Sequence, residues 1–317
     1  MNSLKSDQSK VPLTSEPNSQ AQALTETKPG IQSKQLALAI VKSLIFLLLA
    51  IYGGQPLIEA ISQLLPSMST SFAAYLLWGL LLLWIVGRFI EKRTLGDYGL
   101  RAKGFWAGLT EFYDGSLIGS SMVTTVTVIL ATLGCYEALR INTQCQLLAF
   151  IPGLIAAAIF EEILFRGYVL QTIERVSNTK TAVIISSLLF GAAHINNFQP
   201  DVPLFNQIAS CAALGLDAGL LFSAAYLYTR RLWLAAGLHA FWNIFEGPVF
   251  GTPVSAYNFG IPLITGRLQG PPLLTGGVFG PEASIVEVTV CLLLAWAIWK
   301  RSSGGPVSYQ LVEIGRA

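Results

Sequence analysis

The chain has 317 residues, of which 53% are hydrophobic and only 12% are charged, and its mean hydropathy is +0.57. Soluble domains carry roughly 25% charged residues, so this composition excludes an ordinary soluble enzyme and predicts an integral membrane protein. The net charge is only +2, and no basic stripe with interleaved aromatic residues is present. We therefore expect no nucleic-acid partner.

The first 35 residues are rich in Ser, Gln, Thr, Pro and Lys. Such a segment cannot bury enough apolar surface to fold alone, so we predict a disordered cytoplasmic tail over residues 1–35. The first apolar run starts at Leu36 and is not followed by a small-residue cleavage site, which argues against a removable signal peptide. Residues 301–317 are predicted to form a short cytoplasmic tail.

Apolar segments fill the chain between these tails, from residue 36 to residue 300. A helix satisfies its own backbone hydrogen bonds in lipid, and no segment alternates with the period of a barrel strand. We predict an all-α fold, a polytopic integral membrane helical bundle of about eight transmembrane helices. They are expected at residues 36–52, 72–90, 116–133, 147–165, 181–194, 207–228, 232–245 and 284–299.

Lys and Arg concentrate in every second loop and at both ends of the chain. Because cytoplasmic loops carry the positive excess, we expect eight crossings with both termini in the cytoplasm, in the plasma (inner) membrane. Residues 96–106 are predicted to form an interfacial segment, and the Gly- and Pro-rich loop 247–281 to be a functional lid or disordered. Its end, with Pro281 and Glu282, is typical of a helix start.

The four cysteines show no zinc-ribbon or C-x-x-C spacing. A bridge between Cys135 and Cys145 across a short outer loop remains an open alternative. Two of the cysteines fall inside apolar runs, where a cysteine usually serves as a small hydrophobic residue.

The sequence EEILFR holds two adjacent carboxylates and an arginine in an apolar surrounding. An ionisable residue inside a membrane helix costs roughly 2.5 to 3.5 kcal/mol, so this segment is a candidate site. Glu162 and Arg166 are i and i+4 and share a helix face, whereas Glu161 points about 100° away. Arg166 can therefore neutralise Glu162 and leave Glu161 free to face a cavity. The alternative is a charged helix end with Arg166 reaching to the interface.

The only two histidines of the chain, His194 and His239, both lie in apolar segments. Asn243 follows His239 at i+4, on the same helix face. The alternatives are a bonded interior histidine for His194 and polar contacts between helices for the pair His239 and Asn243.

Together these groups suit hydrolysis of an amide without a nucleophilic serine or cysteine. A carboxylate can act as general base for water, and imidazole and amide groups can hold that water and stabilise the oxyanion. Metal ligation is the other use of the same groups: Glu161, His194 and His239 would form a two-His, one-Glu zinc set. The H-E-x-x-H motif is absent, so we favour no cofactor and keep zinc as an alternative.

The motifs EEILFR, FGAAH (residues 190–194) and HAFWN (residues 239–243) resemble, in order and spacing, the E-E-x-x-x-R, F-x-x-x-H and H-x-x-x-N motifs of the CPBP intramembrane proteases. This family, also called Abi, includes the type 2 CAAX prenyl endopeptidases and bacteriocin-immunity proteins. The resemblance covers roughly residues 97–299, which we expect to form the protease core.

The resemblance implies that Glu161 activates water together with His194, and that His239 and Asn243 stabilise the oxyanion. Glu162 and Arg166 are then supporting residues. It further implies an intramembrane endopeptidase acting on a peptide or protein, either a prenylated C-terminus or a transmembrane segment, in contact with membrane lipid. The alternatives are a non-catalytic immunity or binding protein of the same family and a zinc-dependent protease.

Two features do not fit the predicted spans. The predicted spans place Glu161 near the cytoplasmic side and His194 toward the outer end of a short helix. Because a helix rises 1.5 Å per residue, the two side chains would be too far apart for one active site. We expect the fourth helix to continue through Gly167 to about Ile173, and the fifth to start later. Asp217 and Glu287 are intramembrane acids outside the three motifs and have no assigned role.

Overall fold

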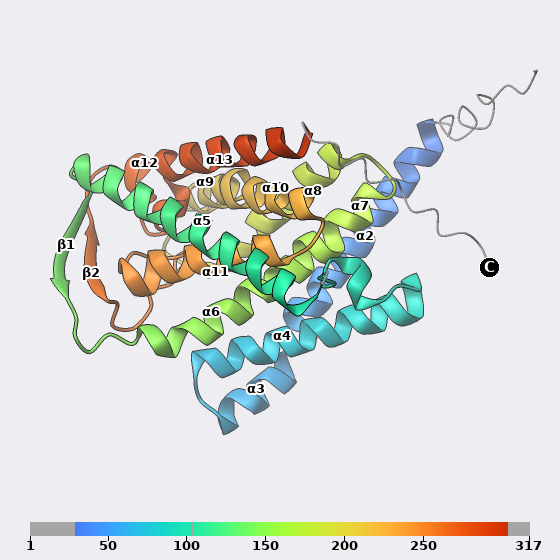
Figure 1. Cartoon of the computed structure of the whole chain (residues 1–317), viewed down its shortest axis with the longest axis horizontal. Helices are drawn as coiled ribbons and strands as arrows, with labels where there is room; N and C mark the ends of the chain where they lie inside the picture. Colours follow the sequence, from blue (N-terminus) through green and yellow to red (C-terminus); the bar gives the residue numbers. More distant parts are fainter. Residues whose placement is uncertain (1–28, 103, 304–317) are drawn as a thin grey trace, which may run out of the picture.

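The computed structural model describes residues 29–102 and 104–303 as a helical bundle in which most helices run along the long axis of the molecule (Figure 1). The predicted all-α membrane bundle is confirmed, and the chain is a multi-pass integral membrane protein. Five helical segments in the described part are long and apolar enough to cross a bilayer: Ser33–Leu64, Met68–Glu91, Phe105–Thr132, Leu147–Glu174 and Leu204–Thr229.

The first half of the chain forms the helices that surround the site from one side. In order they are α2 (Pro29–Tyr52), α3 (Gln55–Leu64), α4 (Met68–Ile85), the π-helical turn η1 (Val86–Glu91), the 3-10 turn η2 (Leu95–Tyr98), α5 (Phe105–Thr132), α6 (Leu147–Glu162), the π-helical segment η3 (Ile163–Leu170) and α7 (Gln171–Glu174).

The second half supplies the remaining helices of the bundle. They are α8 (Thr179–Ala193), the 3-10 turn η4 (His194–Asn197), α9 (Leu204–Leu214), the π-helical turn η5 (Gly215–Gly219), α10 (Leu220–Thr229), α11 (Trp233–Ile244), the π-helical turn η6 (Phe245–Val249), α12 (Pro272–Thr275), the 3-10 turn η7 (Pro281–Ala283) and α13 (Ile285–Ser303).

Each of the eight predicted segments corresponds to one of these helices or to a helix with its continuation. The largest difference at the start of a helix is that α5 begins at Phe105 instead of residue 116. Helix α3 was not predicted. Of the expected tails, residues 1–28 and 304–317 lie outside the described residues, while residues 29–35 belong to α2 and residues 301–303 to α13.

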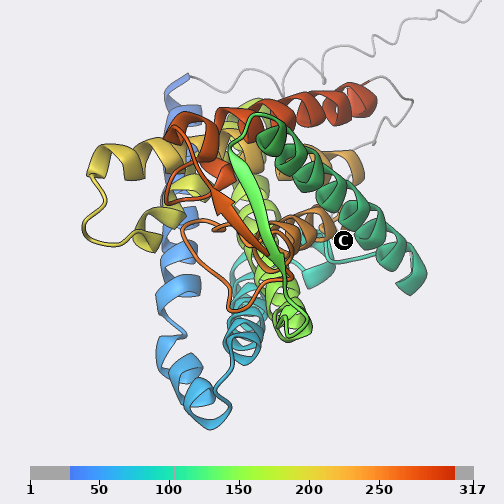
Figure 2. The ribbon, with the colours of Figure 1, turned by 90° about the vertical axis from the view of Figure 1, so that its left-hand side faces the viewer.

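Two short strands, β1 (Tyr136–Ile141) and β2 (Ile264–Leu268), were missed because they lie in the connections between apolar segments. They pair antiparallel and lie across one end of the bundle, facing the viewer in Figure 2. The pairing joins the α5–α6 connection to the long loop before α13. The cysteine bridge kept as an alternative is wrong, because Cys135 and Cys145 are both free thiols.

Helix α5 packs along α11 at very short range. A Cβ added at Gly115 would lie 2.1 Å from the carbonyl oxygen of Leu234, and one at Gly119 would lie 2.3 Å from that of Leu238. Lipid gives no hydrophobic drive for helices to associate, so close backbone packing through small residues supplies much of the attraction. The G-x-x-x-G spacing of α5 therefore fixes the position of α11.

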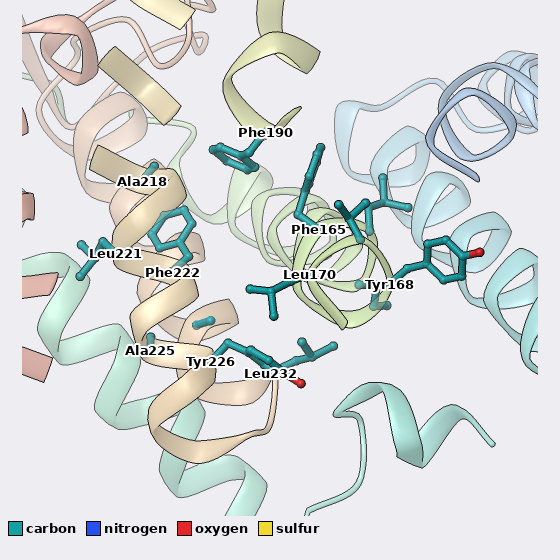
Figure 3. Packing of buried hydrophobic residues seen from close by; sticks show 14 of the residues in the cluster. Phe165, Tyr168, Leu170, Phe190, Ala218, Leu221, Phe222, Ala225, Tyr226 and Leu232 are labelled. Atoms are coloured by element: carbon teal, nitrogen blue, oxygen red, sulfur yellow. The ribbon is translucent and has the colours of Figure 1, made fainter. Parts of the chain in front are cut away.

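Aromatic side chains from three helices meet in the centre of the bundle (Figure 3). The ring centroids of Phe165 and Phe190 are 5.1 Å apart and those of Phe190 and Phe222 are 6.1 Å apart, both in edge-to-face geometry. Such pairs contribute about 0.5–1.5 kcal/mol beyond their buried area. This rigid aromatic cluster lies directly beside the charged residues of EEILFR.

Candidate active site

The two adjacent glutamates lie at the end of α6, where the helix widens into the π-helical segment η3. Glu162 is fully buried in the bundle, whereas Glu161 lines a cavity. The expectation that the two side chains diverge is therefore confirmed. Local π-helical geometry is rare and often occurs at functional sites.

The buried partner of Glu162 is Arg166, which is also completely inaccessible to solvent. Its Nη1 donates to Glu162 Oε1 over 3.0 Å, and its Nη2 donates to the carbonyl oxygens of Ala218 and Gly219 over 3.2 and 3.0 Å. The guanidinium also lies over the ring of Phe222, 5.2 Å from the centroid. The π-helical turn η5 supplies both carbonyls, so Arg166 ties α6 to the α9–α10 helix.

Both histidine rings turn the same nitrogen toward Glu161. His194 Nδ1 contacts the carbonyl oxygen of Phe190 at 2.9 Å, and His239 Nδ1 contacts Glu162 Oε1 at 3.0 Å. Carbonyl and carboxylate oxygens accept hydrogen bonds, so each Nδ1 carries a proton and each ring presents Nε2 to Glu161. These Nε2 atoms lie 3.9 and 3.8 Å from Glu161 Oε2.

The predicted mismatch in depth between Glu161 and His194 disappears in one of the two expected ways. The helix that carries Glu161 does continue through Gly167 and ends with α7 at Glu174. The expectation that the next helix starts later is wrong, because α8 begins at Thr179 and is capped by Asn178, whose side chain accepts the Thr181 N–H. The extension of the helix that carries Glu161 is therefore enough to bring Glu161 and His194 to the same depth.

The cavity beside Glu161 has a volume of about 360 Å³ and is lined mostly by apolar side chains. Its polar lining comes from residues of the loop before α13 and from Glu161, both histidines, Asn243, Asn197 and Tyr75. Asn243 lies one turn after His239 on α11, as its spacing predicted. The structure thus brings all four predicted catalytic residues to one cavity and places Glu162 and Arg166 behind its wall.

Loop residues that the sequence reasoning did not connect with the site also line this cavity. Glu282 and Ser255 are both buried there, and Glu282 Oε2 accepts hydrogen bonds from the N–H and the hydroxyl of Ser255. Burial raises the pKa of Glu282, which lies outside the membrane-spanning helices, to about 7. The only sequence signal was its place in a Gly- and Pro-rich loop, which predicted a helix start and no contact with Glu161.

The two unassigned intramembrane acids, Asp217 and Glu287, are completely buried, as is Glu246 from η6. Among residues 29–102 and 104–303, no hydrogen-bond partner reaches Asp217 Oδ2, Glu246 Oε1 or either carboxylate oxygen of Glu287. None of the three lines the cavity. Buried oxygens without partners are costly, so this interior cluster is a source of instability in the bundle.

Zinc was the alternative for the same residues. Ligand atoms of tetrahedral zinc, bound at about 2.0–2.1 Å, lie about 3.3 Å apart, whereas Glu161 Oε2 is 3.8 and 3.9 Å from the two imidazole Nε2 atoms. Across residues 29–102 and 104–303, no group of three or more His, Cys, Asp or Glu side chains could hold a metal ion. These distances are about 0.5 Å longer than a zinc set requires, and zinc stays the alternative for the same residues.

Comparison with known proteins agrees with the motif resemblance. No curated protein and no solved structure matches the chain. A family model does match residues 143–245, the segment that contains all three motifs and every predicted site residue. That model is described as Type II CAAX prenyl endopeptidase Rce1-like, and the match confirms the predicted resemblance.

Proposed function

We propose that the protein hydrolyses a peptide bond within the membrane with a water molecule that Glu161 activates. One observation carries this proposal: Glu161 Oε2 is buried without a hydrogen-bond partner among the described residues, within 4 Å of the Nε2 atoms of two histidines. A water oxygen can lie about 2.8 Å from both members of such a pair. The three side chains therefore suit one shared water on the wall of a cavity large enough for a peptide.

In the first step Glu161 accepts a proton from this water, and the oxygen attacks the peptide carbonyl carbon. The lone pair of His194 Nε2 holds the water in place, since its Nδ1–H is committed to the carbonyl of Phe190. The C–O bond forms as the carbonyl double bond becomes an oxyanion. General-base assistance of this kind contributes about 10²- to 10⁴-fold in rate.

His239 and Asn243 are proposed to stabilise the oxyanion. The Nδ1–H of His239 donates to Glu162 Oε1, which fixes the ring with Nε2 at the cavity. The amide of Asn243 supplies a second donor. Glu161 then returns its proton to the leaving nitrogen as the C–N bond breaks, so that water is consumed and an acid and an amine are formed.

The test is a comparison of Glu161→Gln with Glu59→Gln, which removes an equivalent charge from an exposed position on α3. Both proteins are reconstituted with two substrates, a prenylated C-terminal peptide and an unmodified transmembrane peptide. We expect Glu161→Gln to lose at least 100-fold in kcat on the substrate that the wild type cleaves, and Glu59→Gln to keep its rate. Equal turnover by wild type and Glu161→Gln would refute the assignment of the base.

Metal dependence is tested on the same preparation. We expect unchanged turnover in the presence of a zinc chelator and less than stoichiometric zinc in the purified protein. Loss of activity with chelator and recovery with added zinc would replace the glutamate mechanism by the metal-dependent one. If the wild type cleaves neither substrate, the non-catalytic binding protein becomes the better description.

A further inference from the structure

Glu282 presents a carboxylate to the cavity from outside the segment that the family model matches. The residue is only 3% exposed. Both of its hydrogen bonds go to Oε2, from the Ser255 N–H at 2.5 Å and the Ser255 hydroxyl at 2.7 Å. In the described part of the chain no donor reaches the other oxygen, Oε1, which is left available to the cavity.

The turn that holds Glu282 is fixed from several sides. Ser255 and Ala256 both have left-handed backbone conformations, with φ of 46° and 69°. The Ala256 N–H donates to the carbonyl of Phe279, and the side-chain amide of Asn197 donates to the carbonyl of Ser255. Since Asn197 belongs to the turn that starts at His194, the carboxylate is positioned relative to the catalytic residues before any ligand binds, which lowers the cost of binding.

The Asp, Glu, Lys and Arg side chains that line the cavity in the described part of the chain are all acidic. Glu161 and Glu282 are its two carboxylates. No Lys or Arg is among the lining side chains in the described part of the chain. Arg166 is fully buried and hydrogen-bonded to Glu162 behind the wall. In a site of low dielectric constant a cation is strongly attracted and an anion is repelled.

We propose that Glu282 Oε1 forms a subsite for a cationic group of the substrate, a Lys or Arg side chain near the scissile bond of an otherwise apolar peptide. The inference rests on the proposed function, because it concerns the substrate of the same cavity. Within the described residues a free C-terminal carboxylate finds no Lys or Arg side chain on the cavity wall. The substrate class is therefore an internal, basic-residue-containing segment of a membrane peptide.

Binding is measured on Glu161→Gln protein in phosphatidylcholine vesicles, so that the result does not depend on catalysis. The probes are dansyl-labelled Leu/Ala transmembrane peptides that differ at one central position, which is Lys, norleucine or Glu. We expect the Lys peptide to bind at least tenfold more tightly than the norleucine peptide, and the Glu peptide to bind most weakly. Adding Glu282→Gln should reduce the Lys preference to less than about twofold, whereas adding Glu59→Gln should leave it intact.

Ser255→Ala provides a milder variant that keeps the backbone N–H of the anchor, and it should reduce the preference only in part. Equal binding of the Lys and norleucine peptides to Glu161→Gln, or a preference that survives Glu282→Gln, overturns the subsite. Neither result tests the assignment of Glu161 as the general base, which depends on the turnover of Glu161→Gln.

Cleavage by the wild type supplies a second readout. Peptides that end in a free carboxylate or in an amide, but are otherwise identical, should be cleaved with similar kcat/KM. A preference of tenfold or more for the free carboxylate would overturn the inferred substrate class.

Discussion

The buried pair of Arg166 and Glu162 allows a quantitative test of how the site is held together. Replacing Arg166 by Met removes the guanidinium and leaves the Glu162 carboxylate buried with His239 as its remaining hydrogen-bond partner. Breaking a buried ion pair in this way costs about 3–5 kcal/mol. The carbonyl of Ala218 also loses its hydrogen bond, worth about 1 kcal/mol, whereas that of Gly219 keeps the hydroxyl of Ser223.

We therefore expect Arg166→Met to lower the free energy of unfolding by about 4–6 kcal/mol. Glu162→Gln alone leaves Arg166 without its counter-charge and should cost about 3–5 kcal/mol. The double variant contains neither charge, and the side-chain amide introduced by Glu162→Gln still offers an acceptor to His239. It should be more stable than the sum of the single losses predicts, by at least about 2 kcal/mol.

The assay is reversible unfolding in mixed micelles, titrated with denaturing detergent and followed by circular dichroism. The matched control is the exposed pair Arg230→Met and Glu174→Gln, whose charged atoms are also in contact, 2.7 Å apart. Exposed pairs couple by about 0.2–1 kcal/mol. A coupling energy of Arg166 with Glu162 below about 0.5 kcal/mol would refute the view that this pair neutralises a buried charge.

Three further predictions concern packing, the interior acids and pH. Gly119→Ala should lower the free energy of unfolding by about 1–3 kcal/mol and lower kcat, because the new methyl group would clash with the backbone of α11. The control is Ser121→Ala at an exposed position of the same helix. Unchanged stability and kcat in Gly119→Ala would contradict the packing argument. Glu287→Met should raise the free energy of unfolding by about 1–4 kcal/mol, because it removes two buried oxygens that have no hydrogen-bond partner among the described residues. A lower free energy of unfolding would contradict this and would indicate that Glu287 shares a proton with the neighbouring acids. The ratio of kcat/KM for Lys over norleucine peptides should fall as the pH drops from 8 to 5.5, because Glu282, with its pKa raised to about 7, becomes neutral. The ratio cancels any effect that is common to both peptides, and it should stay flat in Glu282→Gln.

The bundle could be predicted from the sequence because long apolar runs report directly on membrane helices. The prediction failed where the chain leaves that pattern. β1 and β2 are short strands in connecting segments, each stabilised by its partner more than 100 residues away, and a period-based reading detects no such long-range pairing. The start of α5 at Phe105 was missed for a different reason, because the charged residues near the start of this helix weaken the apolar signal.

The candidate site could be predicted as far as helical spacing reaches. The i to i+4 relations placed Glu162 with Arg166 and His239 with Asn243 on shared faces, and the structure agrees. Glu282 escaped prediction because its position depends on the fold of a loop that pairs through β2 and is held by Asn197. Spacing along a helix carries no information about such a loop.

The close packing of α11 against the glycines of α5 has a practical consequence for protein engineering. The segment that the family model matches, residues 143–245, ends before Glu282 and begins after Gly115 and Gly119. Transplanting that segment alone into another bundle would deliver the histidines and Glu161 without the backbone surface that sets their mutual distance. A functional graft or chimera has to exchange α5 and the loop before α13 along with it.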